Sequence, residues 1–334
     1  MEKKIVVIAA GGTGGHLFPA AAFAEEMFHR GWRVVLMTDA RGRRYAEGFP
    51  AERILDVPAS SLTLNPITAI PALLKISRGI NEAKKVFDEL KPSLVAGFGG
   101  YPSFPALMAA RARRVPIIIH EQNAVLGRVN RAMATSAAFV CCGFERLDRL
   151  PPKAGDRKRV VGNPVRSPIL AVRERPYPEA PAGGRINLLI TGGSQGARLF
   201  GEVIPAAIAM LPQALRARLD VVHQVREEQV AQANKVYQKA HVKAEVAPFF
   251  TDMGQRLGAA HLVISRAGAS SVTELQVAGR PAILVPFAAA ADDHQTANAE
   301  GLTAVGAADL FTEDDFEAAA LAATLERRLA DRHG

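Results

Sequence analysis

Short and almost uninterrupted apolar runs recur along the chain, and each is followed by glycine or polar residues. The runs cover 4–9, 33–38, 94–97, 115–120, 185–191, 219–224, 244–249, 262–265 and 282–285. Runs of this length without alternation are typical of parallel strands that are buried on both faces. Between them lie stretches with helical spacing, such as the one that begins near Pro19 and stops at Gly31. The pattern predicts an α/β fold made of βαβ units.

The succession of strand, double glycine and helix occurs twice, about 180 residues apart, at 11–15 and at 192–196. The segment 151–184 is rich in proline, glycine and charge, as connections between domains often are. We therefore predict two Rossmann-like domains with parallel sheets, 1–161 and 162–334, joined by a linker at about 151–184. A last helix is expected at 314–332.

Length and composition are those of a globular protein, with 334 residues of which 49% are hydrophobic and 22% charged. No apolar run reaches the ~18 residues of a membrane span, and the apolar run at the N-terminus passes directly into a glycine loop. We therefore expect neither a membrane span nor a signal peptide. The adjacent Cys141 and Cys142 have neither metal-ligand spacing nor the geometry to pair with each other. Reduced thiols indicate a cytoplasmic location.

The positive charge of the chain is concentrated in its first half. The whole chain has a net charge of +8, but residues 1–160 contain 24 basic and 14 acidic side chains, and residues 161–334 contain 17 and 19. The first half is therefore expected to meet something negative, either nucleic acid or an anionic membrane surface. Aromatic residues are only 6% and no nucleic-acid recognition motif is found, so we expect no nucleic-acid partner.

The first glycine loop provides backbone N–H groups at a helix N-terminus, with His16 beside them. It is not a dinucleotide fingerprint, because Leu17 stands where the third glycine would be, although Asp39 resembles the acid that binds a ribose. The positive end of the helix disfavours an imidazolium, and a neutral imidazole is what a general base needs. His16 is thus a candidate base, and a structural histidine is the alternative.

Residues 264–298 combine a strand, a loop of small residues, a helix, a second strand and a polar loop. The helix is expected to begin at Ser270 or Ser271, which places Glu274 in its first turn. The first polar cluster is the small-residue loop and helix start that contain Glu274, and the second is the polar loop at 292–298. Each follows the carboxyl end of a strand, where open α/β sheets bind ligands. A nucleotide-sugar is the ligand that this pattern favours. In the alternative, Glu274 only caps the helix and the second cluster is a solvated helix start.

Six motifs in this order resemble the MurG family of peptidoglycan glycosyltransferases. They are GGTGGH (11–16), HEQN (120–123), GNPVR (162–166), GGSQGAR (192–198), SRAGASSVTE (265–274) and ADDHQTANA (291–299). The resemblance runs from about Ile5 to Asp309. It implies a GT-B fold and inverting transfer of N-acetylglucosamine from UDP-GlcNAc to the 4-hydroxyl of the muramic acid of lipid I, which forms lipid II. It also implies that neither a metal nor another cofactor takes part.

The same resemblance assigns roles to individual residues. His16 is the expected general base, and Glu121 is the other candidate. In the alternative interpretation, Glu121 has no catalytic role and only pairs with a nearby arginine. Acceptor-binding residues are expected to be Thr13, His16, Tyr101 and Glu121. Donor-binding residues are expected to be Thr13, Gly14, Gly15, Asn123, Arg166, Ser194, Gln195, Phe250, Glu274, His294, Gln295 and Asn298.

The segment 62–87 mixes apolar and basic side chains. Such a helix either lies on an anionic membrane interface or packs on the sheet as an ordinary amphipathic helix. The resemblance implies a membrane patch here, although SSLTLNP (60–66) replaces the basic glycine turn that is usual in the family. It also implies a peripheral location on the cytoplasmic face of the plasma (inner) membrane, with cell-wall or division proteins as possible partners.

Three other functions remain open from the sequence. A hydrolysing UDP-GlcNAc 2-epimerase would share the architecture and the donor, but it would release UDP without a lipid acceptor. A non-catalytic protein that binds nucleotide-sugars or membranes would be insensitive to replacement of His16 and Glu121. A nicotinamide oxidoreductase would bind a dinucleotide.

Overall fold

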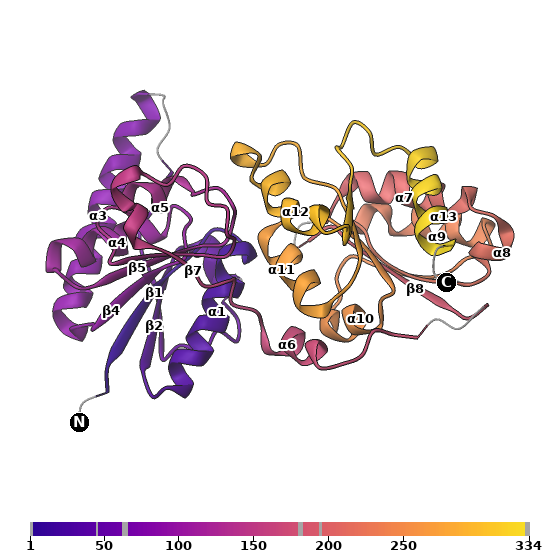
Figure 1. Ribbon diagram of the computed structural model, residues 1–334. Coiled ribbons are helices and arrows are strands. Elements are labelled where there is room, and N and C mark those ends of the chain that lie inside the picture. Colours follow the sequence, from indigo (N-terminus) through magenta and orange to yellow (C-terminus); the bar gives the residue numbers. More distant parts are fainter. Residues whose placement is uncertain (1–2, 45, 62–65, 180–182, 194–195, 331–334) are drawn as a thin grey trace. The chain divides into compact units, whose positions relative to one another are not determined.

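The computed structural model of the chain describes residues 3–44, 46–61, 66–179, 183–193 and 196–330 (Figure 1). The chain divides into two compact units, Met1–Arg166 and Ser167–Gly334. The boundary expected after residue 161 lies a few residues before this division. Each unit is an α/β domain with a parallel sheet of its own, as the apolar runs predict.

The sheet of unit 1 has seven parallel strands in the order β3-β2-β1-β4-β5-β6-β7. The strands are β1 (Ile5–Ala9), β2 (Arg33–Thr38), β3 (Arg53–Asp56), β4 (Leu94–Gly97), β5 (Ile117–Glu121), β6 (Phe139–Cys142) and β7 (Lys158–Val160). Strand β1 is buried along its whole length, which explains why its sequence is apolar at every position. The order reverses between β1 and β4, so the carboxyl ends of these two strands form the switch point where such sheets bind ligands.

Helices cover both faces of this sheet. They are α1 (Gly14–His29), α2 (Ala40–Arg43), α3 (Pro66–Leu90), α4 (Ser103–Arg113), α5 (Arg128–Met133) and a 3-10 helix (Pro152–Arg157). Because successive strand residues point to opposite faces, Val6 and Ile8 pack in one core cluster with α1, whereas Val7 and Ala9 pack in another with α3 and α4. Burial on both faces stabilises the central strands.

The sheet of unit 2 has six parallel strands in the order β10-β9-β8-β11-β12-β13. The strands are β8 (Ile186–Thr191), β9 (Leu219–Gln224), β10 (Lys243–Ala247), β11 (Leu262–Ser265), β12 (Ala282–Leu284) and β13 (Ala308–Leu310). The reversal here falls between β8 and β11. Both strands are followed by glycine-containing loops, so unit 2 repeats the design of unit 1 with a second switch point.

The helices of unit 2 include short and long elements. They are α6 (Ser167–Arg173), α7 (Arg198–Met210), α8 (Gln213–Arg216), α9 (Val230–Lys239), α10 (Met253–Ala259), α11 (Ala269–Ala278), α12 (His294–Ala304) and α13 (Ala318–Ala330), with 3-10 turns at Glu227–Gln229 and Ala291–Asp293. The rings of Phe200 and Phe316 meet in the core beneath α7 (centroids 5.6 Å apart). The described part of the last helix begins at Ala318, four residues later than expected.

The start of α11 differs from the expectation. The helix begins at Ala269 with Gly268 as its N-cap, so Ser270 and Ser271 lie inside the first turn and do not cap it. The reason is that the backbone already turns helical directly after Gly268, whose carbonyl oxygen accepts from the N–H of Val272 (3.0 Å). Glu274 consequently lies in the second turn and cannot complete a capping box. Across the described ranges, no helix is both long and apolar enough to cross a membrane.

Candidate active site

The first glycine turn joins the carboxyl end of β1 to the start of α1. Thr13 is the N-cap of the helix, and its carbonyl oxygen accepts from the N–H groups of His16 and Leu17 (3.2 and 3.3 Å). Gly14 and Gly15 are the first two helical residues, and His16 follows them in the first turn, half-buried. The first N–H groups of the helix and its dipole favour an anion at this end.

Two glycines after β4 form the wall against which the ring of His16 lies. A Cβ atom on Gly99 would lie 3.3 Å from Cε1 of His16, and one on Gly100 would lie 2.6 Å from the carbonyl oxygen of Gly11. Both glycines have positive φ (87° and 74°), which disfavours any L side chain. Glycine at both positions is therefore what allows the imidazole to pack directly on the backbone.

Tyr101 connects the loops that follow β2 and β4. Its hydroxyl donates to Oδ2 of Asp39 (2.5 Å), and Oδ1 of Asp39 accepts from the N–H of Gly42 (2.9 Å) at the start of α2. Burial, followed by the hydrogen bond to Asp39, raises the pKa of the Tyr101 hydroxyl. Tyr101 thus remains protonated and lies at the carboxyl edge of the sheet.

Behind His16, a chain of hydrogen bonds runs into the domain. Nδ1 of His16 lies 3.2 Å from Oε1 of Gln122, and Nε2 of Gln122 lies 3.2 Å from both Nδ1 and the carbonyl oxygen of His120. Nε2 of His120 lies 3.0 Å from the carbonyl oxygen of Gly162. The ring of His120 is buried and stacks on Phe98 (5.4 Å between centroids). Burial lowers the pKa of His120, although the bond to Gly162 acts in the opposite direction, and keeps the ring neutral.

Glu121 is surrounded by hydrogen-bond donors. Its Oε1 accepts from the backbone N–H and from Nδ2 of Asn123 (both 3.1 Å), and its Oε2 accepts from the N–H of Gly127 and Nδ2 of Asn130 (both 2.9 Å). The residue is 2% exposed. A buried carboxylate with four donors shapes the loop between β5 and α5. Of the two neighbours in this motif, Gln122 bonds to His16, whereas Glu121 bonds to donors of its own, and the predicted Asn123 is one of them.

The GNPVR motif packs against the HEQN motif within unit 1. Besides the bond from His120 to Gly162, Nδ2 of Asn163 donates to the carbonyl oxygen of Gln122 (3.0 Å). At the end of the motif the guanidinium of Arg166 lies over the ring of Phe18 (4.7 Å to the centroid). The motif thus supports the residues behind His16 and places the predicted Arg166 beside α1.

The second glycine turn, after β8, is held from beneath by Gln224. Nε2 of Gln224 donates to the carbonyl oxygens of Gly193 and Pro248 (both 3.2 Å), and its Oε1 accepts from Oγ1 of Thr191 (2.8 Å). Gln224 is 4% exposed. One amide therefore fixes the loops after β8 and β10 together. The predicted Ser194 and Gln195 lie outside the described residues.

The loop after β11 and helix α12 are also tied together. Asn298 is fully buried, and its Nδ2 donates to the carbonyl oxygen of Ala267 (3.1 Å). Ser270 presents a buried Oγ that has no partner within the described ranges, at the N-terminus of α11. Glu274 is half-buried one turn further on. The predicted Asn298 thus shapes the loop from inside, while the start of α11 supplies the free polar groups.

The loop after β12 is shaped by an ion pair. The guanidinium of Arg266 pairs with Oε1 of Glu313 (2.5 Å) and donates to the carbonyl oxygens of Val285 and Pro286 (3.1 and 3.3 Å). The predicted Gln295 accepts through Oε1 from the N–H of Phe287 (2.9 Å). The predicted His294 begins α12 and is half-buried. These bonds fix the path of the loop after β12, which leads to the polar residues at 292–298.

The end of β10 carries two phenylalanines of different exposure. Phe249 is 66% exposed, whereas the predicted Phe250 is 7% exposed and lies under the guanidinium of Arg256 (4.2 Å). Hydrogen bonds that Arg256 donates to the carboxylates of Glu245 and Asp252 raise the pKa of Arg256 and keep it charged. The ring of Phe250 therefore supports the loop, while its backbone lies at the carboxyl edge of the sheet.

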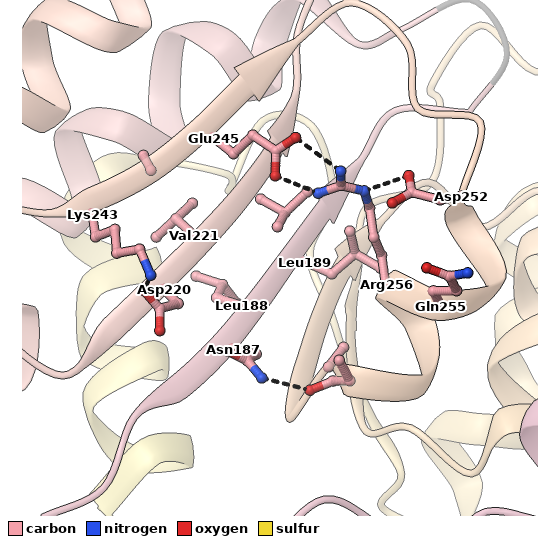
Figure 2. A pocket seen from close by; sticks show the side chains of 14 residues that line it. Asn187, Leu188, Leu189, Asp220, Val221, Lys243, Glu245, Asp252, Gln255 and Arg256 are labelled. Atoms are coloured by element: carbon pink, nitrogen blue, oxygen red, sulfur yellow. Dashed lines mark hydrogen bonds and ion pairs between the residues drawn. The ribbon is translucent and has the colours of Figure 1, made fainter.

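A separate hollow of about 450 Å³ lies between α10 and strands β8, β9 and β10 of unit 2 (Figure 2). Its polar lining includes the amides of Asn187 and Gln255 and two sets of ion pairs: Arg256 with Glu245 and Asp252 (both 2.6 Å), and Lys243 with Asp220 (3.0 Å). Asp220 and Lys243 lie at the amino ends of β9 and β10. The hollow thus extends to the amino ends of these strands, and none of the predicted site residues lines it. Nowhere in the described ranges do three or more His, Cys, Asp or Glu residues gather as a metal site.

Solved structures with the same two-unit architecture define the class. The chain is 32% identical to Acinetobacter baumannii MurG, with a TM-score of 0.77 over 98% of this chain and 93% of that one. It matches CalG4, a calicheamicin glycosyltransferase, at 16% identity and a TM-score of 0.66 over 99% and 91% of the two chains, which supports the fold alone. The fold is therefore the GT-B type of glycosyltransferases.

Sequence comparison narrows the class to one family. The N-terminal and C-terminal domain models of glycosyltransferase family 28 match residues 6–141 and 187–333. Relatives from Maricaulis maris and Caulobacter vibrioides (strain NA1000 / CB15N) are 52% and 50% identical over 99% and 98% of the chain, and the matches cover 90% and 91% of those relatives. Both are named UDP-N-acetylglucosamine–N-acetylmuramyl-(pentapeptide) pyrophosphoryl-undecaprenol N-acetylglucosamine transferase. The chain belongs to glycosyltransferase family 28.

Three residues at these strand ends were not predicted as site residues from the sequence. Gln122 and His120 belong to a motif from which only Glu121 and Asn123 were selected. Gln224 lies in no motif, and its signal is a polar residue at the end of an otherwise apolar strand. A polar side chain at the carboxyl end of a buried parallel strand is the pattern that would have found all three.

Proposed function

We propose that the protein transfers N-acetylglucosamine from UDP-GlcNAc to the 4-hydroxyl of the muramic acid of lipid I. The names of its relatives support this substrate pair. The observation that carries the proposal is His16, which lies in the first turn of α1 with Nδ1 directed at Gln122. Its other ring nitrogen forms no hydrogen bond within the described part of the chain. An imidazole held in this way suits the removal of a proton from an attacking hydroxyl.

In this mechanism His16 takes the proton of the 4-hydroxyl while the oxygen attacks the anomeric carbon and UDP leaves. Configuration at that carbon is inverted, because the attack and the departure occur on opposite faces. General-base help is typically worth about 10²- to 10⁴-fold, so orientation and stabilisation of the diphosphate must supply the rest. Glu121 is the weaker candidate, since its two oxygens already accept four hydrogen bonds.

We assign the donor to the carboxyl edge of unit 2 and the acceptor to that of unit 1. The N–H groups at the start of α11 and the hydroxyl of Ser270 suit the diphosphate, and the half-buried Glu274 suits the ribose hydroxyls. His294 is assigned to the N-acetylglucosamine, while Gln295 and Asn298 hold the loop that presents it. Arg166 neutralises diphosphate charge. Thr13 and Tyr101 line the acceptor side.

The acceptor is a lipid, and α3 provides a surface for its membrane. Ala72, Ile76 and Phe87 bury one face of this helix against the sheet. Near its start, Ile70 (64% exposed), Leu73 (53%) and Leu74 (67%) project outward beside cations such as Lys75, and in Figure 1 this end of α3 extends past the other helices of unit 1. An apolar cluster flanked by cations favours peripheral attachment to an anionic bilayer, here the cytoplasmic face of the plasma membrane.

The transferase is tested by measuring UDP release from UDP-GlcNAc with and without a soluble lipid I analogue. We expect release only with the acceptor, together with a disaccharide product. Release without the acceptor would instead indicate a hydrolysing epimerase and would overturn the proposal. Binding of UDP-GlcNAc without any release would indicate a binding protein.

Attachment is tested with anionic vesicles and the variant Ile70→Ser/Leu74→Ser. Burying a large apolar side chain contributes about 1.5–3 kcal/mol, so we expect vesicle binding to weaken by more than tenfold. Val305→Ser, which alters a side chain that is 76% exposed in unit 2, is the control. Equal binding by both variants would exclude α3 as the attachment surface.

A further inference from the structure

The hydrogen-bond chain behind His16 has only one consistent assignment of protons. The carbonyl oxygen of Gly162 can only accept, so Nε2 of His120 carries a proton and donates to it (3.0 Å). In the neutral ring, Nδ1 of His120 is then an acceptor. It faces Nε2 of Gln122 (3.2 Å), whose amide group donates to it. The carbonyl oxygen of Gly162 thus fixes the protons at one end of the hydrogen-bond chain.

The orientation of the Gln122 amide is fixed by a second backbone group. The carbonyl oxygen of His120 lies 3.2 Å from Nε2 of Gln122 and also can only accept. The NH₂ group of Gln122 therefore uses its two protons on the carbonyl oxygen and on Nδ1 of His120. Its Oε1 has to face His16, at 3.2 Å from Nδ1. An amide oxygen accepts and does not donate, so Nδ1 of His16 carries the proton.

We propose that Gln122, oriented by His120, is a positioning residue that holds His16 in the Nδ1–H tautomer and leaves the lone pair on Nε2 for the acceptor hydroxyl. In water the Nε2–H tautomer is the favoured one, so the folded chain selects the form that an unassisted histidine populates less. A hydrogen bond to one ring nitrogen sets the role of the other. The balance is simple: Nε2 receives the hydroxyl proton, and the imidazolium keeps both of its N–H bonds.

Burial makes this selection effective. Gln122 is 2% exposed and His120 is 6% exposed, so water does not compete for their polar atoms. The carbonyl oxygen of Gln122 is also tied down, because Nδ2 of Asn163 donates to it (3.0 Å), and Nδ2 of Asn130 donates to the carbonyl oxygen of His120 (3.1 Å). The backbone on either side of the Gln122 side chain is thus fixed, and a flipped amide would place two oxygens face to face.

The hydrogen-bond chain also joins three motifs that are distant in sequence, GGTGGH, HEQN and GNPVR. His16 and Gln122 are 106 residues apart, and His120 and Gly162 are 42 apart. Gly162 has a positive φ of 76°, so a glycine presents this carbonyl oxygen at little conformational cost. The role of the GNPVR motif in unit 1 is therefore to terminate the hydrogen-bond chain.

The direct test is nitrogen NMR on wild-type protein that carries ¹⁵N-labelled histidine, with His16 assigned from the His16→Gln variant. Long-range proton–nitrogen correlations distinguish the two neutral tautomers. We expect the Nδ1–H form for His16. Observation of the Nε2–H form in the folded wild-type protein would overturn the proposal without the need for any further variant.

The kinetic test uses Gln122→Met, which keeps the length of the side chain but has no amide oxygen. We expect kcat to fall about ten- to hundredfold while KM for UDP-GlcNAc stays within about twofold, since loss of tautomer control reduces the reactive fraction of the base. The NMR signal of His16 should shift towards the Nε2–H form. His120→Phe preserves the stacking on Phe98 and the backbone carbonyl, so a smaller loss of kcat is expected. Gln232→Met, at an exposed position of α9, is the matched control.

This inference rests on the proposed function, and the outcomes separate the two. If His16→Gln abolishes transfer but Gln122→Met leaves both kcat and the tautomer unchanged, the hydrogen-bond chain has no role and only the present inference fails. If His16→Gln transfers sugar at the wild-type rate, His16 is not the base and both the mechanism and the inference fail. If the wild-type protein releases UDP without an acceptor, the proposed transferase fails first.

Discussion

Each of the two units carries a histidine and a glutamine at the carboxyl end of one strand of its sheet, but the spacing differs. In unit 1 they are His120 and Gln122, two residues apart, and in unit 2 they are His223 and Gln224, which are adjacent. Residues two apart on an extended strand share a face, whereas neighbours point to opposite faces. The pair in unit 1 therefore bonds to itself and to His16, and the pair in unit 2 is separated.

The consequence is visible in the partners. In unit 2, Nδ1 of the fully buried His223 lies 2.8 Å from the hydroxyl of Tyr237 in the core, while Gln224 faces the loops and bonds to backbone carbonyl oxygens. Gln122 instead bonds to the ring of His16. One glutamine thus acts on a titratable side chain and the other acts on loop shape. The comparison teaches that a single-residue difference in spacing directs one glutamine to a side chain and the other to the backbone of two loops.

The largest expected effect is at His16. Replacing His16 with Gln should reduce kcat by about 10²- to 10⁴-fold, equivalent to about 3–5 kcal/mol of activation free energy, because the general base is lost. KM for UDP-GlcNAc should change little, since we assign His16 to the acceptor and most donor contacts to the carboxyl edge of unit 2. Steady-state kinetics measure both. The control is His29→Gln, at the exposed end of the same helix.

The next effect concerns Glu121 and its neighbours. Glu121→Ala should lower the free energy of unfolding of unit 1 by about 3 kcal/mol, because four donors, including those of Asn130 and Gly127, lose a buried acceptor. Glu121→Gln should be almost as destabilising, since its NH₂ group would face donors. Denaturant unfolding measures the loss. A Glu121→Gln protein with wild-type stability and a thousandfold lower kcat would make Glu121 the base instead.

The buried histidine of unit 2 predicts a pH dependence of stability. Burial lowers the pKa of His223 to about 3, below the value of 6.5 in the unfolded chain. The stabilisation is therefore complete above about pH 6.5 and is lost as the pH falls towards 3, by up to about 1.4 kcal/mol per pH unit. The variant His223→Leu/Tyr237→Phe should show a flatter dependence of Tm on pH in this window.

The matched control for this prediction is His241→Asn. His241 is exposed and has a positive φ of 53°, a conformation that asparagine tolerates. The pH dependence of this control should equal that of the wild-type protein. An unchanged slope for the double variant would show that His223 is not the group that couples protonation to unfolding.

The smallest effect should come from Gln224. Gln224→Leu removes the bonds to Gly193 and Pro248, so the loops after β8 and β10 lose their common support. We expect KM for UDP-GlcNAc to rise about tenfold, or about 1.4 kcal/mol, with kcat within about twofold. A fall in kcat at constant KM would show that the two glutamines do not differ in the way proposed. Gln232→Leu is the control.

Much of the architecture followed from local pattern. The apolar runs predicted the parallel strands, and the glycine turns at 11–15 and 192–196 predicted two similar units, because burial on both faces and tight turns restrict which residues are allowed. The motifs identified the family, which the comparisons confirmed. Individual boundaries were less secure, as the start of α11 at Ala269 shows, since several small residues there can all begin a helix.

The sequence by itself thus determined the fold class, the family and which segments supply polar groups. Only the tertiary structure decided what those groups do. Glu121 and Gln122 are neighbours in one motif, yet the first is enclosed by four donors from the loop that follows and from α5, and the second reaches a histidine 106 residues away. Hydrogen bonds depend on distances of a few tenths of an ångström between atoms that the fold brings together, and spacing along a chain does not contain that information.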